Sequence, residues 1–228
     1  MKDIGDRIIS HAAAFSIEAA SKELYERSKV KRELKVKFIN DNLVELGGPG
    51  LCFKENKLLK AVESGFAFPQ IVSLIFNFIN GIESILILLE IRKILSSDTV
   101  NSEKVSLGLR SGLTGATTFA NYDIRYKKLL DEHKDEVVLF SIDKTKISIW
   151  LYFSSENTWK VQSGTFSREP TTTFTFKDLS VANNAISGRF DHLGGPAVGD
   201  AKVSGNLPFL DKIGYISRKV EQQVPSIL

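Results

Sequence analysis

The chain has little of the chemistry on which disulfide frameworks and metal sites depend. Cys52 is its one cysteine, so no internal disulfide can form, and a reducing compartment is expected. The three histidines, His11, His133 and His192, are isolated and accompany no cysteine or carboxylate at metal-ligand spacing. The sequence therefore predicts neither a metal site nor a disulfide-stabilised fold.

Catalytic and phosphate-binding motifs are missing as well. Two glycine-rich segments, 108–115 and 194–199, lack the Gly-Lys-Ser/Thr ending of a phosphate loop. Asp191 and His192 follow closely on Ser187, but sequence neighbours do not make a catalytic triad, which is recognised by its geometry. We therefore expect no enzymatic activity, no catalytic residues and no cofactor.

The chain also lacks a clear signal peptide or membrane span. Acidic residues at 3 and 6 and the absence of a long apolar core argue against a signal peptide. Residues 66–82 carry no charge, but Glu83 interrupts the run of about 20 apolar residues that a span needs. We expect a cytosolic protein in which 66–95 is a broad-faced helix packed on the C-terminal domain or on a second copy of the chain. Its polar stripe (Ser73, Asn77, Asn80 and Ser84) is expected opposite its apolar side, which includes Ile82, Leu86 and Leu89.

What is present is the composition of an ordinary globular protein. Of the 228 residues, 43% are hydrophobic and 25% are charged, which suits one large domain or two small ones. The net charge of +3 tolerates an anionic partner without requiring one. A basic cluster (Arg27, Lys29, Lys31, Arg32, Lys35 and Lys37) is read first as a solvated helix end. A transient anionic membrane surface remains a possible partner for it, whereas no nucleic acid is expected.

Residues 1–100 are expected to form a mainly helical region. Residues 3–28 have helical spacing, 34–38 alternate like a short strand, and the glycines and proline of 46–50 indicate a turn. A short helix is expected at 54–63. Residues 96–102 are polar and rich in helix breakers, so the domain boundary is placed there, and a second domain is expected over 104–228.

The second half is expected to be a strand-rich unit closed by helices. Gly108, Gly112 and Gly115 are expected to loosen the chain before a helix over 116–133. Apolar alternation then predicts three hairpin-linked strands at 137–142, 147–153 and 158–163, which form an antiparallel meander. A fourth strand is expected near 174–176 and a fifth at 201–204. The fold class is therefore α+β: a five-stranded, mainly antiparallel sheet covered by helices, with a helical N-terminal extension.

Two helices complete this half. One begins after Asp178 and ends before Gly188, which suits a C-terminal cap. Asn206 can cap the last helix, in which Phe209, Ile213 and Ile216 share an apolar stripe. That stripe is expected to cover the sheet as a lid.

This order of elements resembles the sterol carrier protein type 2 domain family over about residues 116–224. The residues that carry the resemblance are 174–179 (Phe-Thr-Phe-Lys-Asp-Leu), 186–188 (Ile-Ser-Gly) and 198–206 (Val-Gly-Asp-Ala-Lys-Val-Ser-Gly-Asn). The resemblance implies a hydrophobic tunnel between sheet and helices that binds a lipid or acyl chain.

A tunnel also has a physical rationale, because helices that cover a sheet without packing fully leave a gap lined by apolar side chains. The candidate lining residues are Phe140, Ile142, Ile149, Leu151, Phe174, Phe176, Leu179, Ile186, Val203, Phe209, Ile213 and Ile216. The alternative is a protein–protein interaction module in which these residues form a solid core and the N-terminal helices bind the partner. A homodimer is compatible with either interpretation.

Overall fold

The computed structural model describes residues 4–40, 43–49, 51–54, 58, 69, 77–191 and 194–223. The N-terminal part contains α1 (Ile4–Glu26), β1 (Val36–Asn40), β2 (Leu43–Leu46), β3 (Cys52–Lys54) and α4 (Phe78–Leu95). The central part contains α5 (Ser102–Tyr122), α6 (Ile124–Leu130), the 3-10 helix Asp131–His133, β4 (Val137–Ile142), β5 (Ser148–Phe153) and β6 (Trp159–Ser163). The last part contains β7 (Thr172–Phe176), α7 (Leu179–Ile186), α8 (Gly194–Ala197), β8 (Ala201–Ser204) and α9 (Leu207–Gln223). The predicted helix at 54–63 and the start of the helix predicted over 66–95 lie largely outside the described residues.

The main sheet has five strands in the order β6-β5-β4-β7-β8. The meander β4-β5-β6 is antiparallel as predicted, and β8 pairs antiparallel with β7. The pair β4–β7 is parallel, so the sheet is mixed rather than purely antiparallel. The α+β class and the five strands predicted from the sequence are confirmed.

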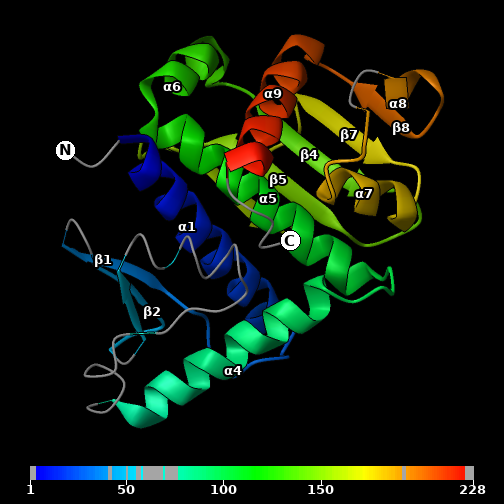
Figure 1. The fold of residues 1–228 in the computed structure, drawn as a ribbon. Coiled ribbons are helices and arrows are strands. Elements are labelled where there is room, and N and C mark those ends of the chain that lie inside the picture. The colour runs from blue at the N-terminus through cyan, green and yellow to red at the C-terminus, as the bar shows by residue number, and fades with distance from the viewer. Residues whose placement is uncertain are drawn as a thin grey trace.

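One face of this sheet carries the core. Ile149 and Leu151 on β5 are fully buried, and α5 and α9 cover the face to which they belong (Figure 1). The opposite face carries hydroxyl pairs, such as Ser141 with Thr175 at 2.9 Å between their oxygens. Trp150 lies on that face, donating its indole N–H to the Gly164 carbonyl at 2.6 Å. The alternation read from the sequence therefore assigned the two faces of β5 correctly.

The glycines at 108, 112 and 115 do not loosen the chain, and that prediction is wrong. All three lie inside the continuous helix α5, where they recur at steps of four and three and so share one face. A Cβ on Gly108 would lie 2.7 Å from Ile186 Cγ2, and one on Gly115 would lie 3.2 Å from both Ser16 Oγ and Val220 Cγ1. Gly108 and Gly115 are thus positions of close helix packing. The predicted helix 116–133 is divided at Asp123, whose carboxylate caps α6 by accepting a hydrogen bond from the Arg125 N–H at 2.9 Å.

The N-terminal region adds a second, smaller sheet with the strand order β1-β2-β3. α1 lies between this sheet and the main one (Figure 1). Its residues Ile8, Ala12 and Ala13 belong to the core of the main sheet, and Ile17 and Leu24 belong to a second core with β2, β3 and α4. The separation of 1–100 from 104–228 as domains stays a prediction, and α1 contributes to both cores.

The described part of the predicted helix at 66–95, α4, packs only part of its apolar side on the rest of the chain. Gly81, Ser84 and Ile87 are buried, whereas Leu86 and Leu89 are 58% and 54% exposed. Ser84 faces inward because its hydroxyl accepts a hydrogen bond from Arg32 at 2.9 Å. The polar stripe is divided between two environments, since Ser84 is buried and Asn80 is exposed; Ser73 lies outside the described residues.

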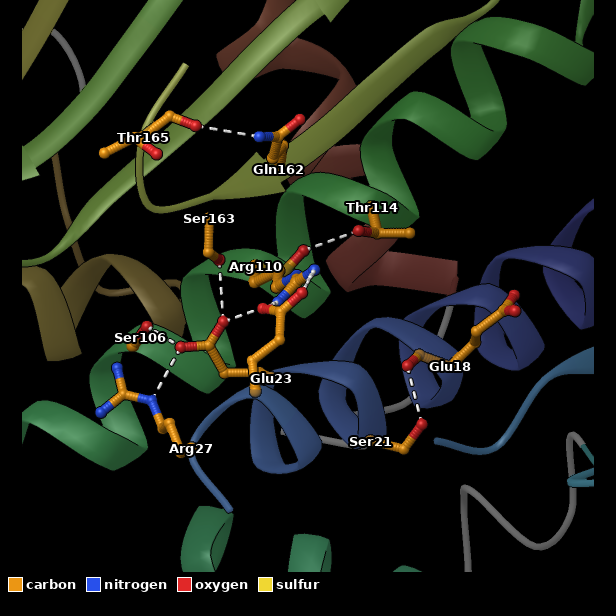
Figure 2. Close-up of polar contacts among 11 residues, drawn as sticks. Glu18, Ser21, Glu23, Arg27, Ser106, Arg110, Thr114, Gln162, Ser163 and Thr165 are labelled. Atoms are coloured by element: carbon orange, nitrogen blue, oxygen red, sulfur yellow. Dashed lines mark hydrogen bonds and ion pairs between the residues drawn. The ribbon is translucent and has the colours of Figure 1, made fainter. Parts of the chain in front are cut away.

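A buried ion pair joins α1 to the main sheet (Figure 2). The Glu23 carboxylate accepts hydrogen bonds from Ser106 at 2.6 Å, Arg110 at 2.8 Å, Ser163 at 2.8 Å and Arg27 at 2.9 Å. Burial alone would raise the pKa of Glu23, but these donors outweigh it and lower the pKa to about 2. The carboxylate is therefore charged at neutral pH and links α1, α5 and β6.

Candidate functional site

A largely apolar cavity of about 800 Å³ lies between the main sheet and the helices that cover it. Its wall is formed by α5, the C-terminal end of α7, α8 and α9, which surround one end of the sheet (Figure 1). A volume of this size falls within the range of about 300 to 1,000 Å³ that is typical of small-molecule pockets. The cavity is the candidate functional site.

The sheet supplies an aromatic floor to the cavity. Phe140 on β4 pairs with Phe174 on β7, and Phe174 pairs with Val203 on β8, so the three side chains form a row across the strands. The rings of Phe140 and Phe174 lie 6.0 Å apart, and Phe176 meets Phe174 edge to face at 4.8 Å. Phe190 packs edge to face against Phe174 and Phe176 at 6.0 and 5.7 Å and so supports the floor.

The wall opposite the floor contains positions without side chains. Gly108 and Gly112 of α5 line the cavity together with Leu109 and Leu113. At Gly108 the place of a side chain is taken by Ile186, which also lines the cavity, so this wall is formed by the backbone of α5 together with Ile186. The same residues that misled the sequence prediction thus contribute to the cavity.

One face of α9 closes the cavity. The lining residues Leu207, Leu210, Gly214, Ser217 and Glu221 recur at steps of three and four, which places them along one stripe of the helix. The stripe changes in character along its length: it is apolar at the start of α9 and polar in the last turns. The end of the cavity beside Ser217 and Glu221 is called its polar end, although Val220 also lines it and Asp211 lines the end beside Leu207 and Leu210.

Hydrogen bonds fix the start of α9 over the sheet. The Asn206 side chain caps the helix by accepting a bond from the Phe209 N–H at 3.1 Å, as its position in the sequence predicted. Its amide nitrogen donates to Glu136 at 2.7 Å, and Glu136 also accepts from Thr172 at 3.0 Å. This carboxylate at the start of β4 thus anchors both β7 and α9, which together bound the cavity.

The polar end of the cavity is formed where α7 and α9 converge. Glu221 Oε2 would lie 2.9 Å from a Cβ on Gly188, which ends α7 with a φ of +67°. Burial raises the pKa of the Glu221 carboxyl, and the positive charge of Arg218 opposes this rise. Ser187 and Ser217 line the same region.

Six of the twelve residues predicted from the sequence line the cavity: Phe140, Phe174, Phe176, Ile186, Val203 and Ile213. The other six are packed in the core and are not among the residues that line it: Ile142, Ile149, Leu151, Leu179, Phe209 and Ile216. Of the expected lid stripe on α9, Phe209 and Ile216 are packed in the core and Ile213 lines the cavity, next to the stripe that begins at Leu207. A role in ligand contact stays a prediction for all twelve.

Sequence reasoning missed the α5 wall and most of the α9 stripe. Gly108, Gly112 and Gly214 were missed because a search for apolar side chains overlooks residues that have none. Ser217 and Glu221 were missed because they are polar, although their spacing from Leu207 and Leu210 is helical. A helical-wheel reading of α9 that included polar residues would have found the second stripe.

No group of three or more histidine, cysteine, aspartate or glutamate side chains is placed to hold a metal ion in the part of the chain that the structure describes. Across these same residues, no helix combines the length and the apolar character needed to cross a bilayer.

No protein-family model and no curated protein matches the chain. Among solved structures, the chain is similar to the sterol carrier protein domain 2 of Helicoverpa armigera, with 17% identity and a TM-score of 0.41 over 57% of this chain and 100% of that chain. It is also similar to a structure described as UbiJ-SCP2 ubiquinone synthesis protein, with 17% identity and a TM-score of 0.38 over 55% of this chain and 98% of that one.

A third similar structure matches a larger share of this chain but a smaller share of its own. The sec-alkylsulfatase Pisa1 from Pseudomonas sp. matches 88% of this chain but only 32% of its own chain, with 10% identity and a TM-score of 0.30. With TM-scores of 0.30 to 0.41, these overlaps are loose. Sterol carrier protein 2 domains are nevertheless among the solved structures to which this chain is similar, as the sequence resemblance predicted.

Proposed function

We propose that the chain binds a single lipid or acyl chain in the cavity and performs no covalent chemistry on it. The observation that carries this proposal is the cavity of about 800 Å³ with an aromatic and aliphatic lining. Binding would be driven by desolvation of the alkyl chain, at about 0.8 kcal/mol for each buried methylene. Roughly ten methylenes would contribute about 8 kcal/mol, which lies within the range of about 4 to 15 kcal/mol that association costs. A long chain is therefore needed for tight binding.

The experiment uses N-phenyl-1-naphthylamine, an uncharged probe whose fluorescence rises in apolar sites. Titration into the full chain, freed of co-purifying lipid, should saturate and be reversed by an unlabelled long-chain lipid. The matched control is protein unfolded in urea, which should give no saturable signal. A folded chain that gives no saturable signal would refute the proposal.

A second candidate function, self-association, is favoured by the exposed side of α4. Phe78, Ile79, Ile82, Leu86 and Leu89 are 38–74% exposed, although all five are large and apolar. Ile79, Ile82, Leu86 and Leu89 follow steps of three, four and three, which is the spacing of a coiled-coil seam. Apolar patches of more than a few hundred Å² are rare on monomers, so we propose that this stripe pairs with the same stripe of a second copy.

Sedimentation of the full chain tests self-association. The wild type should sediment as a dimer, and Leu86→Glu should sediment as a monomer because it places a charge in the centre of the seam. Glu90→Gln, which changes a neighbouring half-buried side chain, is the control and should stay dimeric. A monomeric wild type at concentrations of about 100 µM would exclude a dimer of useful affinity.

A cytosolic location and a transient anionic membrane surface are parts of the same proposal. Several residues of the basic cluster already have partners within the chain: Arg27 pairs with Glu23 at 2.9 Å, and Lys29 pairs with Glu103 at 3.6 Å. Arg32 donates to the Gly47 carbonyl at 2.7 Å. These contacts favour the interpretation as a solvated, internally paired surface over a dedicated membrane site.

A further inference from the structure

The charged side chains that line the cavity all have the same sign. Among the described residues, the lining includes two carboxylates, Asp211 and Glu221, and no lysine, arginine or histidine. Both residues lie on α9 and both are exposed, so their carboxylates line the cavity where it meets solvent. An anionic ligand would therefore enter a cavity whose described lining provides no cation to pair with it.

The backbone adds to this electronegative character at the polar end. α7 ends at Ile186, and Glu221 lies in the last turn of α9, which ends at Gln223. The carboxylate of Glu221 is adjacent to Gly188, so the C-terminal ends of both helices meet at the polar end of the cavity. A helix C-terminus carries partial negative charge and so disfavours anions. The carbonyls of Asn183, Asn184 and Ala185 in α7 already accept hydrogen bonds from residues 187–189, so the acceptors left for a ligand are side chains.

The side chains at this end are acceptors that suit a donor from the ligand. The Ser187 hydroxyl donates to the Asn183 carbonyl at 2.8 Å, which leaves its oxygen as an acceptor. Ser217 lies one turn before Glu221 on the same stripe of α9. The positive charge of Arg218 lies near enough to Glu221 to lower the pKa of that carboxyl, but Arg218 is not among the lining residues. The Glu221 carboxylate therefore offsets the charge of Arg218, which could otherwise attract an anion.

The opposite end of the cavity suits an alkyl chain. Leu207 begins the α9 stripe 14 residues before Glu221, which corresponds to about 21 Å along the helix at 1.5 Å per residue. Leu210 and the 60% exposed Leu207 line the cavity together with Phe140, Phe174 and Val203 of the floor. The lining of α9 therefore extends over several turns, with Ser217 and Glu221 at one end and Leu207, Leu210 and the exposed carboxylate of Asp211 at the other.

We propose that the cavity selects long-chain lipids with an uncharged, hydroxyl-bearing head group and discriminates against lipids with an anionic head. The inference rests on the proposed function, since it specifies the ligand of the same cavity. The head-group hydroxyl donates to the acceptors at the end of α7 and α9, and the chain extends along the aromatic floor. A carboxylate or phosphate head meets Glu221 and two helix C-termini without a cation among the described lining residues.

The test compares two lipids with identical chains, oleyl alcohol and oleic acid. Each is used at pH 8 to displace N-phenyl-1-naphthylamine from the full chain, below the concentration at which either aggregates. Oleyl alcohol should bind at least about tenfold more tightly than oleate, since tenfold is the effect of one modest electrostatic or hydrogen-bond difference. Glu221→Gln combined with Asp211→Asn removes both lining charges and should bring the ratio of the two affinities towards one.

Glu156→Gln provides the control, because Glu156 is an exposed carboxylate between β5 and β6 that does not line the cavity. The ratio of the affinities of Glu156→Gln for oleyl alcohol and oleate should equal that of the wild type. Equal or tighter binding of oleate by the wild type would overturn the inference while leaving the proposed function intact. An unchanged ratio in the folded double variant would overturn it as well. Failure of the probe itself to bind would refute the proposed function together with the inference.

Discussion

Glu23→Gln tests whether the N-terminal helix and the main sheet are held together by one buried carboxylate. Glu23 is 3% exposed, and Arg110, one of its partners, is 2% exposed. The substitution keeps the size of the side chain but removes its charge. It leaves the guanidinium of Arg110 buried with Glu26, whose side chain is 43% exposed, as its remaining ion-pair partner.

Two independent arguments give the magnitude of the effect. A fall of the Glu23 pKa from 4.5 to about 2 corresponds to on the order of 3 kcal/mol of stability at neutral pH. Removing one partner of a buried ion pair typically costs about 3 to 5 kcal/mol. Because most domains are stable by only about 5 to 15 kcal/mol, a loss of this size is readily measured.

Urea unfolding at several pH values distinguishes the charge from simple packing. Glu23 has a depressed pKa, so its contribution is present above pH 4.5 and is lost as the pH falls towards 2. The free energy of unfolding of Glu23→Gln should be about 3 kcal/mol below that of the wild type at pH 7, and the gap should narrow below pH 4.5. Glu26→Gln, at the more exposed partner, should cost about 1 kcal/mol or less. A gap for Glu23→Gln that is the same at pH 7 and pH 3 would contradict the electrostatic argument.

Three further predictions follow from packing and charge. Ala185→Trp fills the cavity and should abolish probe binding while the melting temperature is retained. Ala197→Trp, on the exposed surface of α8, should leave probe binding intact. Equal binding by both variants would contradict the assignment of the cavity as the binding site. Gly108→Ala places a Cβ 2.7 Å from Ile186 and should cost about 1 to 3 kcal/mol in urea unfolding, and Ile186→Ala in the same chain should recover part of that loss. Burial and the nearby charge of Arg7 lower the pKa of His11 to about 4, so its contribution to stability should be lost as the pH falls from 6.5 to 4. The melting temperature of His11→Phe should therefore fall less over this range than that of the wild type. Identical pH profiles of the two proteins would argue against a lowered pKa of His11.

Much of the main sheet could be predicted from local sequence. The alternation of Ile149 and Leu151 with Trp150 is a period of two, and burial of one face makes that pattern obligatory. The caps at Asp178 and Asn206 were predictable because a side-chain acceptor just before an apolar stripe satisfies the free N–H groups of a helix start. The parallel pairing of β4 with β7 was not, because it depends on where the chain returns after β6.

The N-terminal region and the cavity depend on contacts between distant segments. Gly108 and Gly115 indicate a loop when read locally, yet they are tolerated in α5 because Ile186, Ser16 and Val220 pack against them. Ser84 faces inward because Arg32, which is 52 residues away in the chain, provides its partner. For the same reason, the sequence identified the aromatic floor of the cavity but not the helix surfaces that leave it open.

Native mass spectrometry of the full chain tests the central claim most directly. The protein is incubated with an equimolar mixture of uncharged and anionic long-chain lipids and compared with Ala185→Trp treated in the same way. The account predicts that each wild-type chain gains the mass of one lipid and that the folded variant gains none. A folded wild type that stays unliganded at every lipid concentration, or a variant that binds as much lipid as the wild type, would contradict the assignment of the cavity as a lipid site.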